Sequence, residues 1–293
     1  MNSNLKAILI VSITVVILFF SCTAPFNINT RDSEPVLVIY GCLTDENRNQ
    51  FIRLTRSSPY FLNEENQVVS DAKVWVTSSN GREYAFQYDK NGYYVSQRRF
   101  AVAAGVTYRL SVEVDFNNDG KKDLYEAETV TLPKLPVDSV SVFKLSIMGF
   151  LHYSLNIHMQ DPIETENYYL FNFFINDTIT NEKITDFIIT DDQMFNGHYI
   201  DGISITYFNS ASDFENREND WDMFLVNPGD RIRLHIMNIE KGYYNFIREC
   251  MMEKYGENPF FGGPPSNIHT NLPKGAVGYF TSFCIQEKET VIP

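Results

Sequence analysis

One acidic stretch of the sequence has the residue types and spacing of a calcium-binding loop. It reads DFNNDGKKDLYE from Asp115 to Glu126 and matches the pattern D-x-[DN]-x-[DN]-G-x5-E at every fixed position. Ca²⁺ takes six or more oxygen ligands at about 2.3–2.6 Å, and carboxylates on alternate residues around a glycine can surround one ion. The predicted ligands are the side chains of Asp115, Asn117, Asp119 and Asp123 and the carbonyl oxygen of Lys121.

The residues on both sides of this loop have the pattern of strands, not of the two helices of an EF-hand. We therefore predict a β-hairpin version of the loop that holds a structural Ca²⁺, and we leave Glu126 out of the ligand set. The alternative is a hairpin whose Asp, Asn and Gly residues only form the turn.

The sequence carries no familiar catalytic motif. GxSxG, HExxH, the P-loop and GxGxxG are all missing. His152 and His158 are six residues apart and would share one face of a strand, but no third ligand is near, so we interpret both as ordinary surface or core residues. Asp191 and Asp192 are adjacent in a polar stretch between strands, where turn residues are more common than an acid–base pair. We predict no catalytic residues.

Two short triplets have the Asp-Ser/Thr-apolar pattern of a bacterial O-glycosylation acceptor. They are Asp138-Ser139-Val140 and Asp177-Thr178-Ile179. Average composition gives roughly one such triplet per 300 residues by chance. Ser139 and Thr178 are the candidate modification sites, and chance occurrence of such a triplet is the alternative.

The first 22 residues have the layout of a secretory signal that ends at a cysteine. Lys6 is followed by the uncharged run 7–20, then by Ser21 and Cys22. A run of about 14 residues is roughly 21 Å long as a helix, short of the ~30 Å hydrocarbon core. In bacterial lipoproteins such a cysteine is acylated and the leader is cut before it. We predict a signal peptide at 1–21, lipidation of Cys22 and a tether at 22–35; the alternatives are an uncleaved anchor, or an ordinary signal with a chance cysteine.

Charge and cysteine content exclude some classes of partner. The chain has 24 Lys and Arg against 37 Asp and Glu, a formal net charge of −13, so we predict no nucleic-acid partner. Cys42, Cys250 and Cys284 are far apart and show no CxxC spacing, which argues against a zinc site. For an exported protein, one disulfide and one free thiol is an alternative. The apolar surroundings of Cys42 and Cys284 favour buried free cysteines.

The folded part of the chain is predicted to be mainly β. Short segments rich in Val, Tyr, Phe and Thr alternate with the turn signals SSNG, DKNG and NNDG. The seven predicted strands of the first half are 36–43, 51–55, 72–77, 83–88, 93–96, 107–114 and 125–132. This spacing predicts an immunoglobulin-like β-sandwich at 36–134, followed by a hinge at LPKLPV.

The second half is predicted to be a β-rich domain at 138–290 with one helix. Its predicted strands are 140–145, 153–159, 168–175, 186–190, 203–208, 231–239 and 276–285. The helix is predicted at 240–255, where apolar residues recur on one stripe and Gly256 follows as the stop. The loop 258–273 joins the helix to the last strand and is a candidate partner surface.

Several segments together resemble a family of Bacteroidota lipoproteins named domain of unknown function 4249. They include VLVIYGCLTDENRNQFIRLTRSSPYF, VVSDAKVWVTSSNG, GVTYRLSVEV, TLPKLPVDSV, DPIETENYYLFNFFI and NPGDRIRLHIMNI. The resemblance runs from about Cys22 to Ile285. It implies an outer-membrane lipoprotein commonly encoded beside a TonB-dependent transporter, and it offers no catalytic residues to carry over.

These observations lead us to expect a non-enzymatic accessory subunit of a TonB-dependent outer-membrane β-barrel. A lipid anchor would raise its effective concentration beside a membrane partner. One alternative is a stand-alone surface glycan- or peptide-binding module, which predicts exposed aromatic rings. Another is a hydrolase with an unrecognised site, which predicts polar groups converging in a pocket. The face of the outer membrane, periplasmic or external, is left open.

Overall fold

The computed structural model describes residues 35–58, 67–214, 224–256 and 268–293. Cys22, the tether up to residue 34 and most of the predicted partner loop 258–273 lie outside these residues. Pro35–Pro293 forms one compact unit, and it is mainly β, as predicted. No helix among the described residues is both long and apolar enough to cross a membrane.

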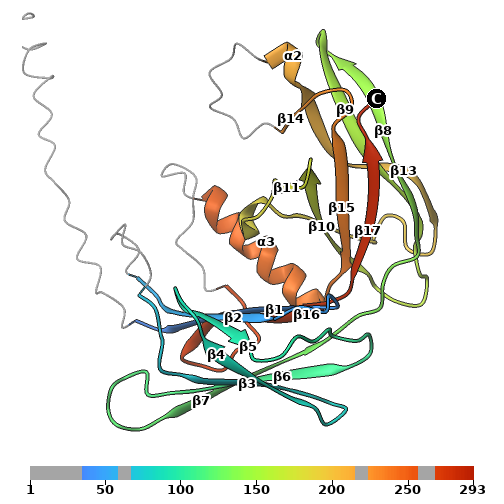
Figure 1. Cartoon of the computed structure of the whole chain (residues 1–293). Helices are drawn as coiled ribbons and strands as arrows, with labels where there is room; N and C mark the ends of the chain where they lie inside the picture. The colour runs from blue at the N-terminus through green and yellow to red at the C-terminus, as the bar shows by residue number, and fades with distance from the viewer. Residues whose placement is uncertain (1–34, 59–66, 215–223, 257–267) are drawn as a thin grey trace, which may run out of the picture. The chain divides into compact units, whose positions relative to one another are not determined.

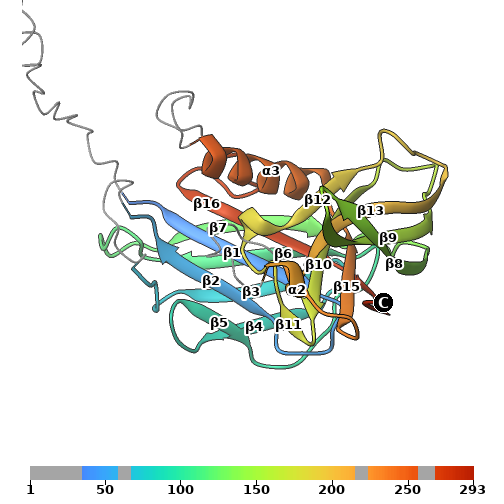
Figure 2. The ribbon, with the colours of Figure 1, turned by 90° about the horizontal axis from the view of Figure 1, so that it is seen from above.

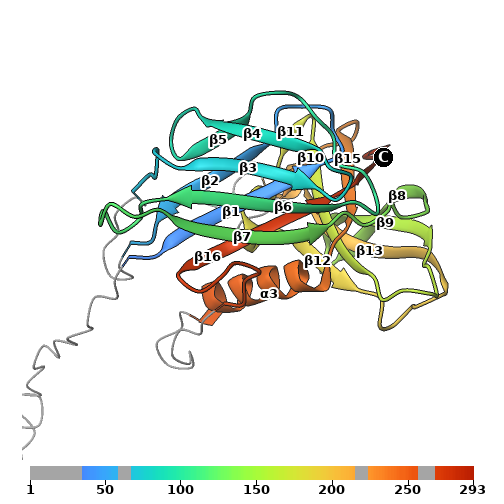
Figure 3. The same ribbon diagram turned by 90° about the horizontal axis from the view of Figure 1, so that it is seen from below.

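The first sheet contains eight strands, seven from the first half of the chain and one from its end. Their order is β16-β1-β2-β5-β4-β3-β6-β7 (Figure 3). The strands are β1 (Leu37–Thr44), β2 (Phe51–Arg56), β3 (Lys73–Ser78), β4 (Glu83–Tyr88), β5 (Tyr93–Ser96), β6 (Thr107–Val114), β7 (Asp123–Val130) and β16 (Ala276–Phe283).

This sheet folds over on itself around one apolar core. Buried side chains alternate along its strands because successive residues of a strand point to opposite faces. Leu37 and Ile39 of β1, Leu110 of β6 and Phe280 of β16 belong to the same cluster, and each is 0% exposed. Figure 1 shows β1, β2 and β16 as one layer above β3, β6 and β7.

The second half forms two further sheets. The five-stranded sheet has the order β11-β10-β15-β17, with β12 also paired to β10. Its strands are β10 (Tyr168–Ile175), β11 (Thr178–Ile179), β12 (Ile188–Asp191), β15 (Arg231–Asn238) and β17 (Ile285–Val291). The four-stranded sheet, order β14-β13-β9-β8, contains β8 (Val137–Ile147), β9 (Phe150–Gln160), β13 (Tyr199–Ser210) and β14 (Leu225–Val226). The helical segments are η1 (Ile184–Asp186), α2 (Ala211–Phe214) and α3 (Lys241–Gly256).

The aromatic run of β10 is buried on both faces. Tyr169, Phe171 and Phe173 pack with β9, β13 and β15 in the core between the two sheets. The alternate residues Tyr168 and Leu170 pack instead with α3. Figure 2 shows α3 beside β16 and β12. The aromatic residues of β10 therefore serve two cores, one on each side of the five-stranded sheet.

The helix α3 connects the five-stranded sheet to the first sheet. The ring of Tyr243 on α3 lies 5.2 Å from the ring of Tyr279 on β16, centre to centre. Its hydroxyl lies 3.2 Å from the hydroxyl of Tyr40 on β1. The helix occupies 241–256, close to the predicted 240–255.

The structure departs from the predicted domain boundaries at the last predicted strand, 276–285. That segment is two strands separated by Cys284: β16 pairs in parallel with β1, and β17 pairs with β15 of the other sheet. The predicted units 36–134 and 138–290 are therefore not two separate lengths of chain. Periodicity specifies that a segment is a strand, but it does not specify which strand lies beside it.

Candidate functional site

The acidic loop forms a tight turn built around one carboxylate. The Asp115 side chain accepts the backbone N–H of Asp119 at 3.0 Å and of Gly120 at 2.9 Å, and Asp119 accepts the N–H of Lys121 at 2.8 Å. No group of three His, Cys, Asp or Glu side chains within the described residues is placed to hold a metal ion. Asp115, Asp119 and Asp123 therefore do not form such a group, and the structural Ca²⁺ stays a prediction.

Both modification candidates lie at exposed positions. Ser139 is on β8 and Thr178 is at the start of β11, and both are exposed. Thr178 follows Asn176 and Asp177, which have φ values of 47° and 68° and form a tight turn. Asp177 forms an ion pair with Arg231. Exposure is compatible with modification of either hydroxyl, but it does not test it.

The three described cysteines are free thiols. Burial raises the pKa of Cys42 to about 12 and of Cys250 to about 11, and it also raises the pKa of Cys284. A thiol must lose its proton to act as a nucleophile or a metal ligand. These thiols therefore stay protonated at neutral pH.

A cleft of about 520 Å³ lies between the first sheet and the five-stranded sheet. One wall carries Tyr40, Cys42 and the loop residues Glu46 and Arg48, while the other carries residues of β10, β15 and β17. The lining therefore mixes aromatic rings with charges of both signs. Such a mixture suits a ligand with apolar and charged parts.

Arg233 is the most distinctive group in this cleft. Its guanidinium carbon lies 4.6 Å from the centre of the Phe174 ring. Its Nε is buried without a hydrogen-bond partner in the structure, and the guanidinium forms ion pairs with Asp177, 3.5 Å from Nη1, and with Oε2 of Glu287, 3.8 Å from Nε. That same oxygen lies 3.0 Å from Nε2 of His235. The Arg233 side chain is 26% exposed and lines the cleft, so its guanidinium can donate to an acceptor group of a ligand.

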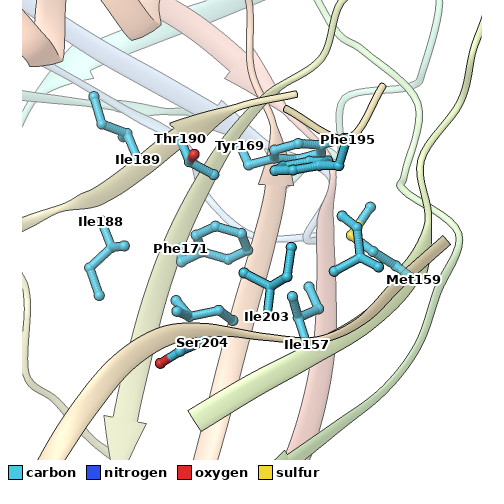
Figure 4. A pocket seen from close by; sticks show the side chains of 12 residues that line it. Ile157, Met159, Tyr169, Phe171, Ile188, Ile189, Thr190, Phe195, Ile203 and Ser204 are labelled. Carbon is cyan, nitrogen blue, oxygen red and sulfur yellow. The ribbon is translucent and has the colours of Figure 1, made fainter. Parts of the chain in front are cut away.

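A second pocket, of about 260 Å³, lies between the two sheets of the second half (Figure 4). It is lined by Ile157, Met159, Tyr169, Phe171, Ile188, Ile189, Thr190, Phe195, Ile200, Ile203, Ser204 and Ile205. The rings of Tyr169 and Phe195 stack at one end, with centres 6.1 Å apart. Burial, together with the hydrogen bond to Asp161, raises the pKa of Tyr169, so its phenol stays neutral. The pocket suits small uncharged apolar molecules and offers no acid–base pair.

Comparison with known proteins identifies the family of the chain. The family described as domain of unknown function DUF4249 matches residues 23–289. The chain belongs to this family. No curated protein matches it. A solved segment of two fibronectin type III domains from chicken tenascin is 12% identical, with 70% of this chain and 90% of that segment covered. The TM-score of that match is 0.19, so it carries no argument about the fold.

Sequence reasoning placed one acidic residue of this DUF4249 chain wrongly. Asp192 was predicted to be a solvated turn residue, but it is 3% exposed and accepts the backbone N–H of Asn167 at 2.7 Å. Asp161 is also buried and accepts the N–H of Gly197 at 2.8 Å. These carboxylates satisfy backbone donors of buried loops, a role that leaves no periodic signal in the sequence.

Proposed function

We propose that this protein is an outer-membrane lipoprotein, held on the membrane by acyl chains on Cys22. In this proposal it is an accessory binding subunit of a TonB-dependent transporter and has no catalytic role in transport. We further propose that the first half is an immunoglobulin-like sandwich. The leader that ends at Cys22 supports the anchor, and the anchor would concentrate the folded unit beside a barrel in the same membrane.

The observation that carries the binding role is the cleft at Arg233. The Arg233 guanidinium can donate to a carbonyl or carboxylate of a ligand, while Glu46 and Glu287 can accept N–H groups from the ligand. Phe51 and Phe174 supply apolar surface in the same cleft. A short peptide combines these features: carbonyls, N–H groups and apolar side chains. We therefore propose peptides as the cargo class that the cleft helps to capture.

The accessory role predicts that a TonB-dependent β-barrel co-purifies with the tagged protein from outer membranes in mild detergent. The variant Cys22→Ala, which has no acylation site, is expected to recover about ten-fold less of that barrel, because the effective concentration given by the anchor is lost. The measurement is mass spectrometry of the co-purified proteins. Arg233→Ala is the matched control: it changes the cleft but keeps the anchor, so the barrel should still co-purify.

Purification of the tagged protein without a co-purifying β-barrel would contradict the accessory role. It would favour the stand-alone glycan- or peptide-binding module instead. One observation supports that second candidate: Phe143, Tyr199 and Tyr207 are each about half exposed, at 51%, 51% and 52%, on the four-stranded sheet. Exposed rings of this kind can stack on sugars.

A further inference from the structure

Three side chains on neighbouring strands of the four-stranded sheet form a continuous hydrogen-bonded chain. The Oγ of Ser141 on β8 lies 2.8 Å from Nε2 of His158 on β9. The other ring nitrogen of His158, Nδ1, lies 3.0 Å from Oδ1 of Asp201 on β13. The three residues therefore have the connectivity Ser–His–Asp, in which each ring nitrogen of the imidazole has its own partner.

The face that carries these residues points away from the apolar core. Tyr153, Leu155, Ile157 and Met159 of β9 are buried between the sheets, so His158 and the other even-numbered residues lie on the opposite face. The His158 side chain is 18% exposed and that of Asp201 is 81% exposed. The chain of hydrogen bonds is therefore reachable from solvent.

Irregular pairing on both flanking strands aims the two partners at His158. The register shifts between Val137 and Ser139 on β8, and again between Asp201 and Ile203 on β13. The extra residue on β13 is Gly202, with a φ of +81°. A Cβ at this position would lie 3.3 Å from Cε1 of His158, so a side chain there would crowd the ring. Bulges of this kind re-aim side chains and are frequent beside active sites.

The hydrogen bonds set the tautomer of the neutral imidazole. The ionised carboxylate of Asp201 can only accept, so Nδ1 of His158 carries the ring proton and donates it. Nε2 then presents its lone pair, and the hydroxyl of Ser141 must be the donor of the second bond. The imidazole is thus placed to act as a base toward the serine hydroxyl, which is the arrangement that activates a serine nucleophile.

We propose that Ser141 is an activated nucleophile and that this face hydrolyses small esters of apolar acids. Oγ of Ser141 forms a bond to the ester carbonyl carbon while its proton moves to Nε2 of His158. The bond to the alkoxide then breaks, and the alkoxide takes that proton and leaves as the alcohol. Water next gives a proton to Nε2 and adds to the acyl carbon, and Oγ leaves with the proton. The net reaction converts ester and water into acid and alcohol.

The apolar part of the substrate is assigned to Phe143. This residue lies two positions beyond Ser141 on the same face of β8, a separation of about 7 Å along a strand, and its side chain is 51% exposed. Tyr207 on β13 and Phe143 on β8 are both register partners of Ser154 on β9. Their rings therefore lie on the two sides of Ser154, on the same face of the sheet. A short acyl chain can lie on these rings while its carbonyl reaches Ser141. This activity is independent of cargo binding in the cleft at Arg233.

The test uses the purified full-length protein in detergent, with 4-nitrophenyl butyrate as substrate and a fluorophosphonate as covalent probe. We expect release of nitrophenolate above the buffer rate, and a phosphonyl adduct on the peptide that contains Ser141. Ser141→Ala and His158→Asn are expected to lower the rate at least about ten-fold, because each removes one member of the nucleophile–base pair. Asp201 is a positioning residue, and Asp201→Asn should lower kcat and leave KM unchanged.

Ser139→Ala is the matched control. Ser139 lies opposite His158 in register on the same face, but the His158 ring bonds to Ser141 instead. This variant should keep the hydrolysis rate and the Ser141 adduct of the protein without substitutions. Thermal unfolding of each variant checks that it is folded. An adduct on another residue, a Ser141→Ala variant as active as the unmodified protein, or no hydrolysis and no adduct at all would each overturn the proposal.

Discussion

Replacing Gly278 with alanine is expected to lower the free energy of unfolding by about 3 kcal/mol or more. Gly278 lies in β16 with a φ of +106°, a region that residues with a Cβ rarely adopt. The added Cβ would collide with the carbonyl oxygen of Ile39 on β1, a backbone atom that cannot move without breaking the strand pairing. Urea unfolding monitored by circular dichroism measures the effect.

The variant Gly81→Ala measures the cost of the backbone conformation alone, without the steric collision expected at Gly278. Gly81 has a φ of +83°, and nothing lies within 4 Å of a Cβ built on it. This variant should therefore cost only the conformational penalty, about 1 kcal/mol. Equal losses for the two variants would contradict the close parallel approach of β16 to β1. A much larger loss for Gly278→Ala supports the conclusion that the end of the chain completes the first sheet.

The second large effect is a loss of stability at alkaline pH. Burial raises the pKa of Tyr40 and of Tyr243 well above the ordinary tyrosine value, and raises the pKa of Cys42 to about 12. Because the folded-state pKa values are the higher ones, the stability that these groups contribute is fully present below about pH 9. It is lost as the pH rises toward about 12, because the unfolded chain loses these protons first. Unfolding free energies measured from pH 7 to pH 11 should therefore be level up to about pH 9 and should fall above it.

The hydroxyl pair of Tyr40 and Tyr243 allows a test of which groups are responsible. The hydroxyls of Tyr40 and Tyr243 are 3.2 Å apart. At pH 7 a single change, Tyr40→Phe or Tyr243→Phe, leaves the other hydroxyl without its partner and should cost about 1 kcal/mol. The double variant removes both polar groups and should be closer to the unmodified protein. It should also lose less stability between pH 9 and pH 11, and an unchanged loss would contradict the role of these groups.

Local elements were well predicted where turn chemistry and periodicity agree. The strands β4 and β6 begin and end where predicted, because SSNG, DKNG and NNDG mark the ends of their hairpins. The helix α3 is displaced by one residue from its prediction. The pairing of β16 with β1 was not predicted, since strands more than 200 residues apart leave no local signal of their contact.

The Ser141–His158–Asp201 chain was also beyond sequence reasoning. Ser141 and His158 are 17 residues apart, and His158 and Asp201 are 43 apart, so their contact depends on strand order and on register. A shift of one residue would turn His158 toward the core. Gly202 gave no bulge signal, because it precedes the predicted strand 203–208, whereas the structure places it inside β13. The predicted calcium loop forms a tight turn around Asp115, and its Ca²⁺ stays a prediction.

The lipid anchor at Cys22 is the feature on which the proposed function depends most directly. The measurement is mass spectrometry of the N-terminal peptide from protein purified out of the outer-membrane fraction. The predicted result is a chain that begins at Cys22 and carries acyl chains on that residue, with Cys22→Ala released from the membrane. A mature chain that still begins at Met1, or that carries an unmodified Cys22, would contradict the lipoprotein and, with it, the accessory role.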